Sequence, residues 1–191
     1  MSDLVSYIKE ANHTFVTDHA ASGITELSKY PARKLAVLAC MDARLLYLLE
    51  PALGLKRGDA NIIKVAGNTA GRGFDSVIGS LMVAVYELHV EDILVIGHDD
   101  CGMLHTTSAS LCEKMAAAGI PAAVIEELEP RLMAWADPVC DSEESVRVTV
   151  RQLQKNPYLP DTVRFHGAVI RPDTGDVRFI VENAEKKVRL I

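Results

Sequence analysis

The stretch Lys34-Leu-Ala-Val-Leu-Ala-Cys40 decides the fold. A continuous apolar run of this length predicts a strand that is covered on both faces, as in a parallel sheet. The stretches Asn61-Ile-Ile-Lys-Val-Ala66 and Asp92-Ile-Leu-Val-Ile-Gly97 predict two more strands of the same kind. Between them, residues 74–89 carry apolar side chains at helical spacing. Strands that alternate with helices indicate a mostly parallel α/β sheet.

The rest of the chain fits the same plan. Periodicity and turn signals predict helices over 3–20, 101–118, 121–135 and from Ser142, a fourth strand over 162–170 and an antiparallel edge strand over 177–181. We therefore expect one domain over 1–191, in which residues 1–30 form a helical arm and residues 31–191 an α/β core. Its central sheet has four mostly parallel strands and an antiparallel edge strand, flanked by helices.

The composition excludes several classes of protein. A net charge of −6 over 191 residues argues against a nucleic-acid partner, whose phosphates would be repelled. No apolar run is long enough to span a membrane, so no membrane partner is expected. The first residues carry no secretory signal, and in a cytosolic chain of this size four cysteines do not indicate a disulfide framework. We therefore expect a cytoplasmic protein.

Three residues of metal-ligating types, two cysteines and one histidine, stand at or just after strand ends. Cys40 ends the first strand, His98 follows the third, and Cys101 comes three residues later, in the first turn of the next predicted helix. Ligands in open α/β sheets gather beyond the carboxyl ends of strands, so these side chains reach one crevice if the two strands are neighbours. Thiolates and imidazole are ligands that zinc prefers. The pattern predicts a zinc ion with three protein ligands and one changeable coordination position.

Asp42 and Arg44 stand beside the first of these residues and have two interpretations. They are an ordinary surface ion pair, or a dyad in the metal crevice. As a dyad, Arg44 holds Asp42 as a hydrogen-bond acceptor for metal-bound water, or Asp42 itself takes the fourth coordination position. His105 is a candidate proton shuttle, although an exposed helical histidine is the commoner case.

The motifs Cys-x-Asp-x-Arg (40–44) and His-x-x-Cys-Gly (98–102) resemble those of the β-class carbonic anhydrases of the compact prokaryotic type. Ala66-Gly67-Asn68 and Phe165-His166-Gly167-Ala168-Val169 are secondary similarities, and the resemblance covers about residues 30–180. It implies one Zn²⁺ per subunit, bound by Cys40, His98 and Cys101. It also implies reversible hydration of carbon dioxide to bicarbonate and a proton by zinc-bound hydroxide, in a homodimer or tetramer whose helical arm packs on the partner.

Other aspects of the site stay open. We expect the loops at Gly67, Asn68 and Gly102 to receive the developing bicarbonate oxygen. Asp99-Asp100 follows His98, where the family pattern more often has a small hydroxyl residue and then an acid or Ser. We interpret the extra carboxylate as a solvated residue at a helix start, or as a group that alters proton traffic or substrate entry. The alternative functions are a zinc hydrolase of carbon disulfide or carbonyl sulfide, and a non-catalytic zinc-binding protein.

Overall fold

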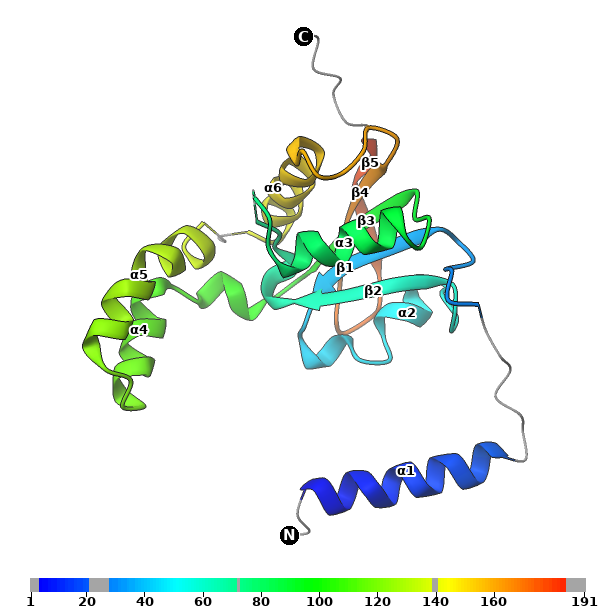
Figure 1. Cartoon of the computed structure of the whole chain (residues 1–191), viewed down its shortest axis with the longest axis horizontal. Helices are drawn as coiled ribbons and strands as arrows, with labels where there is room; N and C mark the ends of the chain where they lie inside the picture. Colours follow the sequence, from blue (N-terminus) through cyan, green and yellow to red (C-terminus); the bar gives the residue numbers. More distant parts are fainter. Residues whose placement is uncertain (1–3, 21–27, 72, 139–140, 185–191) are drawn as a thin grey trace.

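A five-stranded sheet forms the centre of the protein. The computed structural model describes residues 4–20, 28–71, 73–138 and 141–184, and within them the strand order is β2-β1-β3-β4-β5 (Figure 1). The strands β1 to β4 run parallel, and β5 is antiparallel to β4. Their bounds are Leu35–Cys40, Ala60–Val65, Asp92–His98, Arg164–Ile170 and Val177–Ala184. The predicted fold class is confirmed.

The strand order reverses at β1. The chain passes from β1 to β2 on one side and then crosses to β3 on the other, so β1 and β3 are neighbours. Ala39 of β1 is paired with Ile96 of β3, which brings the carboxyl ends of both strands to one edge of the sheet. A crevice for ligands is expected at this reversal.

Both faces of the sheet are covered, as the apolar runs predicted. Ala36 and Leu38 face one side, where α3 (Ser76–Tyr86) and α6 (Ser142–Lys155) supply the packing partners. Val37 and Ala39 face the opposite side, over the 3-10 helix η1 (Ala43–Leu45) and the short helix α2 (Leu49–Ala52). The alternation follows from the period of two along a strand.

The predicted helix over 101–118 is wrong in its first part. Residues Gly102–His105 form a 3-10 helix, η3, and the α-helix α4 spans only Ser108–Ala117. Thr107 lies between them in an extended conformation, and its hydroxyl accepts a hydrogen bond from the Ser110 N–H. A threonine cap of this kind begins a new helix. Cys101 therefore precedes a 3-10 helix and does not lie in the first turn of an α-helix.

Two helical parts project from this core. Helix α4 packs on α5 (Ala122–Ala136) as a hairpin beyond the sheet, and α1 (Leu4–Ala20) lies apart from the sheet (Figure 1). All side chains from Leu4 to Asp18 are exposed. Within the described ranges, no helix is both long and apolar enough to cross a membrane. Part of the predicted arm, residues 21–27, lies outside the described residues, as does Cys140.

Candidate metal centre

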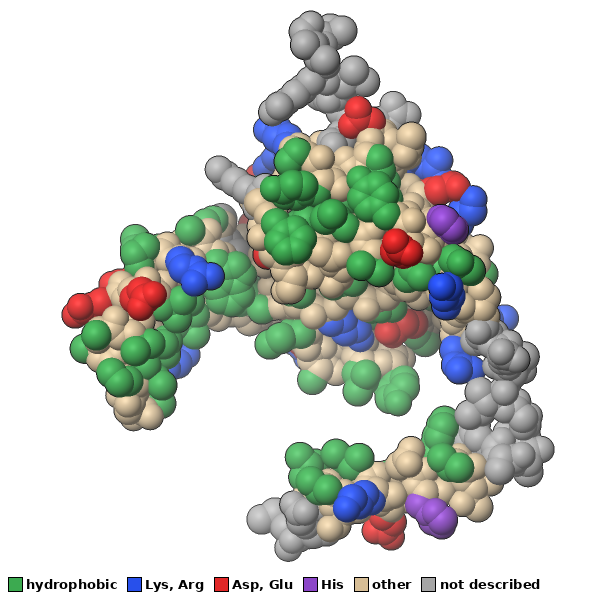
Figure 2. Space-filling view, viewed as in Figure 1, with side chains coloured by type: hydrophobic (Ala, Val, Ile, Leu, Met, Phe, Trp, Pro, Cys, Tyr) green, Lys and Arg blue, Asp and Glu red, His purple; other side chains and the backbone are tan. Residues whose placement is uncertain are grey.

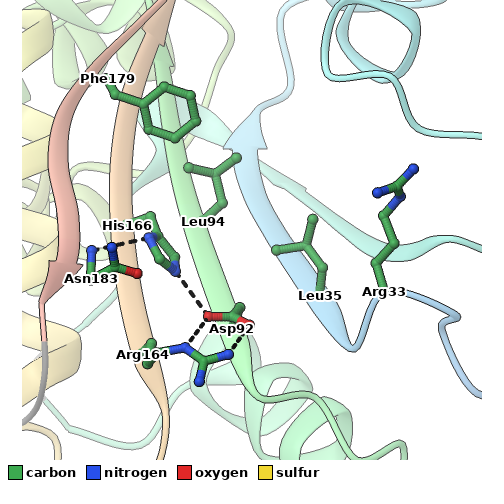
Figure 3. A pocket seen from close by; sticks show the side chains of 8 residues that line it. All are labelled: Arg33, Leu35, Asp92, Leu94, Arg164, His166, Phe179 and Asn183. Carbon is green, nitrogen blue, oxygen red and sulfur yellow. Dashed lines mark hydrogen bonds and ion pairs between the residues drawn. The ribbon is translucent and has the colours of Figure 1, made fainter.

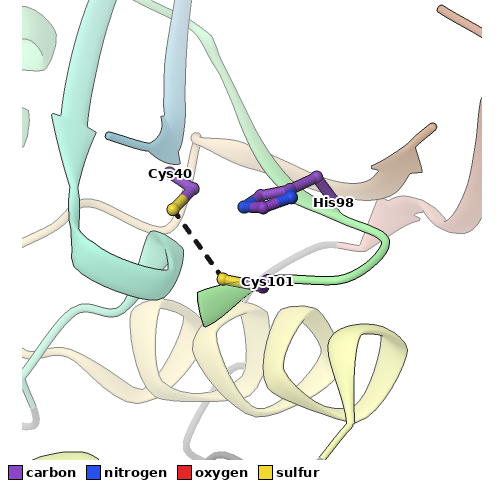
Figure 4. A group of neighbouring side chains, drawn as sticks. All are labelled: Cys40, His98 and Cys101. Atoms are coloured by element: carbon purple, nitrogen blue, oxygen red, sulfur yellow. Dashed lines mark hydrogen bonds between the residues drawn. The ribbon is translucent and has the colours of Figure 1, made fainter. Parts of the chain in front are cut away.

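Cys40, His98 and Cys101 meet at the carboxyl edge of the sheet. Cys40 is the last residue of β1, His98 is the last of β3, and Cys101 follows three residues after His98 (Figure 4). Their ligand atoms all lie within 4.8 Å of one another, and the three residues are at most 5 % exposed. The strand adjacency thus brings together residues that are about sixty positions apart in sequence, as the motif spacing predicted.

The donor atoms fit a zinc ion. Two sulfurs bonded tetrahedrally to zinc at about 2.3 Å lie about 3.8 Å apart, and Cys40 Sγ and Cys101 Sγ are 3.8 Å apart. His98 Nδ1 lies 2.9 Å from the Asp99 carbonyl oxygen, which can only accept, so Nδ1 carries the proton. His98 Nε2 then has a free lone pair, is buried, and has no hydrogen-bond partner among the described residues. A buried acceptor in this state is a ready metal ligand.

Hydrogen bonds to sulfur set the charge of the cluster. The Cys101 thiol, together with the backbone N–H groups of Gly67 and Asp42, lowers the pKa of Cys40 to about 4. The hydrogen bond that the Cys101 thiol donates to Cys40, together with burial, raises the pKa of Cys101. These hydrogen bonds therefore favour the thiolate form of Cys40, which is the form that binds a cation.

Asp42 and Arg44 form a forked ion pair beside the cluster. Arg44 Nε donates to Asp42 Oδ1 at 3.0 Å and Nη2 donates to Oδ2 at 2.9 Å, while the Arg44 backbone N–H also donates to Oδ1 at 2.9 Å. Arg44 thereby lowers the pKa of Asp42 to about 2. Asp42 Oδ2 lies 3.7 Å from His98 Nε2. An ionised carboxylate is thus held within reach of anything bound at the cluster.

Asp100 is a site residue that motif reasoning did not assign. Its carboxylate accepts from Arg44 Nη1 at 3.0 Å, and its carbonyl oxygen accepts from Arg44 Nη2 at 2.8 Å. The Asp100 side chain is 77 % exposed and is nevertheless an ion-pair partner of Arg44. In the sequence, the pair of acidic residues Asp99-Asp100 was the signal that could have indicated this role. Spacing could not identify Arg44 as its partner, because the two residues are 56 positions apart.

The predicted loop residues lie at different depths around the cluster. Gly67 and Asn68 are buried, and the Gly67 N–H donates to the Cys40 sulfur. Gly102 is exposed, and a Cβ built on it would meet no atom within 4 Å. His105 is exposed at the end of η3. Gly67 therefore contacts the sulfur of the candidate ligand Cys40 directly, while Gly102 borders open space.

A separate groove of about 580 Å³ opens at the opposite, amino-terminal end of the parallel strands (Figure 3). Asp92 binds both Arg164, at 2.8 and 2.6 Å, and His166, at 3.0 Å. The lining residues are Arg33, Leu35, Asp92, Leu94, Arg164, His166, Phe179 and Asn183. None of the three clustered metal-ligand candidates lines this groove.

Fold and site together define an α/β protein with a Cys₂His metal centre at a strand-order reversal. The sequence profile of the family described as carbonic anhydrase matches residues 35–177. The chain is 40 % identical over 181 residues to YtiB of Bacillus subtilis, a protein provisionally named as a carbonic anhydrase, and this covers 93 % of the chain and 96 % of YtiB.

A solved structure and a further sequence relative point to the same family. Beta-carbonic anhydrase isoform I of Trichomonas vaginalis superposes with a TM-score of 0.91 at 37 % identity, covering 95 % of this chain and all of that one. Carbon disulfide hydrolase of Acidithiobacillus thiooxidans is also related, at 29 % identity over 76 % of each chain. The protein belongs to the β-carbonic anhydrase family, as its motifs indicated.

Proposed function

We propose that this protein is a zinc enzyme that hydrates carbon dioxide reversibly to bicarbonate and a proton. The observation that carries the proposal is the cluster of Cys40, His98 and Cys101, which offers two sulfurs at tetrahedral spacing and an unpartnered buried nitrogen. Asp42 adds an ionised acceptor at its edge. A purely structural zinc site more often closes with a fourth Cys or His.

The protein's own groups would act as follows. Cys40, His98 and Cys101 would hold the zinc, which would supply an acidified water as the nucleophile. This water would be less acidic than at a site of three histidines, because two thiolates cancel the charge of the ion. Asp42 Oδ2, which lies 3.7 Å from His98 Nε2, would accept a hydrogen bond from that water and orient it toward carbon dioxide. Arg44 keeps Asp42 ionised and fixed. We propose that the loops at Gly67, Asn68 and Gly102 receive the product oxygen through their backbone groups.

Hydrolysis of carbon disulfide is the second candidate. It is favoured by the relationship to a carbon disulfide hydrolase over three quarters of both chains. The same nucleophile could attack either linear molecule, and carbonyl sulfide as well. The difference between them would lie in access to the cluster.

The test is stopped-flow hydration of carbon dioxide by protein of measured zinc content. We expect about one zinc per chain and a rate that rises with pH through the alkaline range. Cys40→Ser should lose most of the zinc and the activity, because one of three ligands is lost. Cys112→Ser is the matched control: Cys112 is a free, half-buried cysteine outside the cluster and should tolerate the change.

A zinc-loaded protein that hydrates carbon dioxide no faster than buffer would refute the proposal. Assays with carbon disulfide and carbonyl sulfide on the same sample would then separate the hydrolase from a non-catalytic zinc protein. A flat rate profile from slightly acid to alkaline pH would contradict the assigned nucleophile.

We further propose a homodimer as the minimum assembly, in the cytoplasm. Figure 2 shows hydrophobic side chains on the surface of α1, and Leu4, Tyr7 and Ile8 are each more than half exposed. An apolar helix face of this kind is typical of a protein interface. Light scattering of wild type and Ile8→Asp tests the assembly, with Lys9→Asp as the control on the same helix. A monomeric wild type would contradict it.

A further inference from the structure

Arg44 is held by two carboxylates from separate segments of the chain. Asp42 lies two residues before it, and Asp100 lies in the turn between His98 and Cys101. Arg44 is 46 % exposed, so its long side chain depends on these partners for a single orientation. The position of Asp42 depends in turn on Arg44.

The two aspartates do not compete for the guanidinium. Asp42 takes Nε and one side of Nη2, whereas Asp100 takes Nη1 with its carboxylate and the other side of Nη2 with its carbonyl oxygen. The Nη2 group has two hydrogens and serves both partners. Every contact of Asp100 with Arg44 is therefore compatible with the two side-chain hydrogen bonds between Arg44 and Asp42, and restricts the motion of this ion pair.

The backbone of Asp100 suits this role. Its φ of +53° lies in the left-handed region, which Asp and Asn tolerate better than most residues. In this conformation both the carbonyl oxygen and the carboxylate of Asp100 reach the guanidinium. The turn that carries His98 and Cys101 is thus tied to the segment after β1, across the mouth of the cluster.

We propose that Asp100 is a positioning residue for the carbon dioxide reaction. It fixes the Arg44 guanidinium, and through it keeps the Asp42 carboxylate paired with Arg44 and turned away from the fourth coordination position. The proposal rests on the proposed function for its effect on rate, but its effect on Arg44 is independent of any reaction. Loss of the Asp100 carboxylate would free Arg44 to move and allow Asp42 to reach the metal.

The test compares Asp100→Asn with wild type. Asparagine keeps the size and the tolerance of a positive φ but removes the ionised acceptor. Glu91→Gln is the control, because it removes one charge from an exposed ion pair with Lys34 at the opposite end of the sheet. The first measurement is hydrogen exchange at Arg44 Nε–H by NMR in the zinc-loaded protein. The second is the fourth zinc ligand by X-ray absorption.

We expect Asp100→Asn to speed exchange at Arg44 Nε–H about two- to fivefold, the effect of one exposed ion pair. Carboxylate should appear as a zinc ligand in part of the molecules, and kcat should fall by a similar factor with KM unchanged. In an Arg44→Ala background the same substitution should change nothing further, because Asp100 acts through Arg44.

Unchanged exchange at Arg44 in Asp100→Asn would overturn the proposal, as would an equal fall in kcat with and without Arg44. Failure of the proposed function would give a different result from failure of the Asp100 proposal. A wild-type protein without hydration activity would leave the exchange measurement at Arg44 intact and interpretable.

Discussion

Gly67 offers a sharp test of how the backbone builds this site. Its φ is +65°, and its N–H donates to the Cys40 sulfur. A Cβ at this position would lie 2.9 Å from Met103 Cγ and 3.2 Å from Met103 Cβ. The clashing atoms are the first two of the Met103 side chain, and Met103 is only 7 % exposed. A rotation of the flexible end of this side chain therefore cannot relieve the clash.

The cost of Gly67→Ala has two parts. A left-handed backbone costs a non-glycine residue about 1–2 kcal/mol, and overpacking a buried site costs about 1–3 kcal/mol. We therefore expect the free energy of unfolding to fall by about 2–5 kcal/mol. Gly54→Ala is the matched control, because Gly54 has a φ of +66° and no atom within 4 Å of a built Cβ. It should lose only the backbone part.

Urea unfolding of both variants, with zinc removed, measures the difference. Competition with a chelator then measures zinc affinity, which should fall in Gly67→Ala because the amide donor to Cys40 moves, and should stay unchanged in Gly54→Ala. If Gly67→Ala is no less stable than Gly54→Ala, the assumed contact with Met103 does not limit this loop. Equal stability of the two variants would therefore refute the predicted clash between residue 67 and Met103.

Three further predictions concern charged groups and thiols. Arg44→Ala should keep its zinc but lose about 10–100-fold in kcat/KM, as is usual for residues that orient a metal site; full activity in stopped flow would refute this. Arg164 holds the pKa of Asp92 below its usual range, so the stabilisation from the ionised carboxylate is complete above about pH 4 and is lost as pH falls further. Urea midpoints should therefore drop more steeply with acid in wild type than in Asp92→Asn, and parallel curves would contradict it. After zinc removal, iodoacetamide at pH 6 should label Cys40 before Cys101, because Cys101 lowers the pKa of Cys40 to about 4; peptide mass spectrometry decides, and equal labelling counts against it.

Local signals were sufficient for most elements. Continuous apolar runs predicted β1, β2 and β3 because strands covered on both faces need apolar residues at every position. The helix after Cys101 was overextended, because the apolar spacing continues through the turn while the cap at Thr107 breaks the backbone. A side-chain cap acts over three residues and leaves the periodicity unchanged, so periodicity alone could not reveal it.

The sequence by itself determined the fold class, the family and the three candidate ligands, because each depends on short motifs and on the period of apolar residues. Only the tertiary structure decided that Asp100 joins Arg44, and that the Gly67 N–H reaches the sulfur of Cys40. These contacts depend on which strands are neighbours and on the path of the turns between them. Hydrogen bonds require distances of about 3 Å, and sequence spacing does not specify distances between segments that are far apart along the chain.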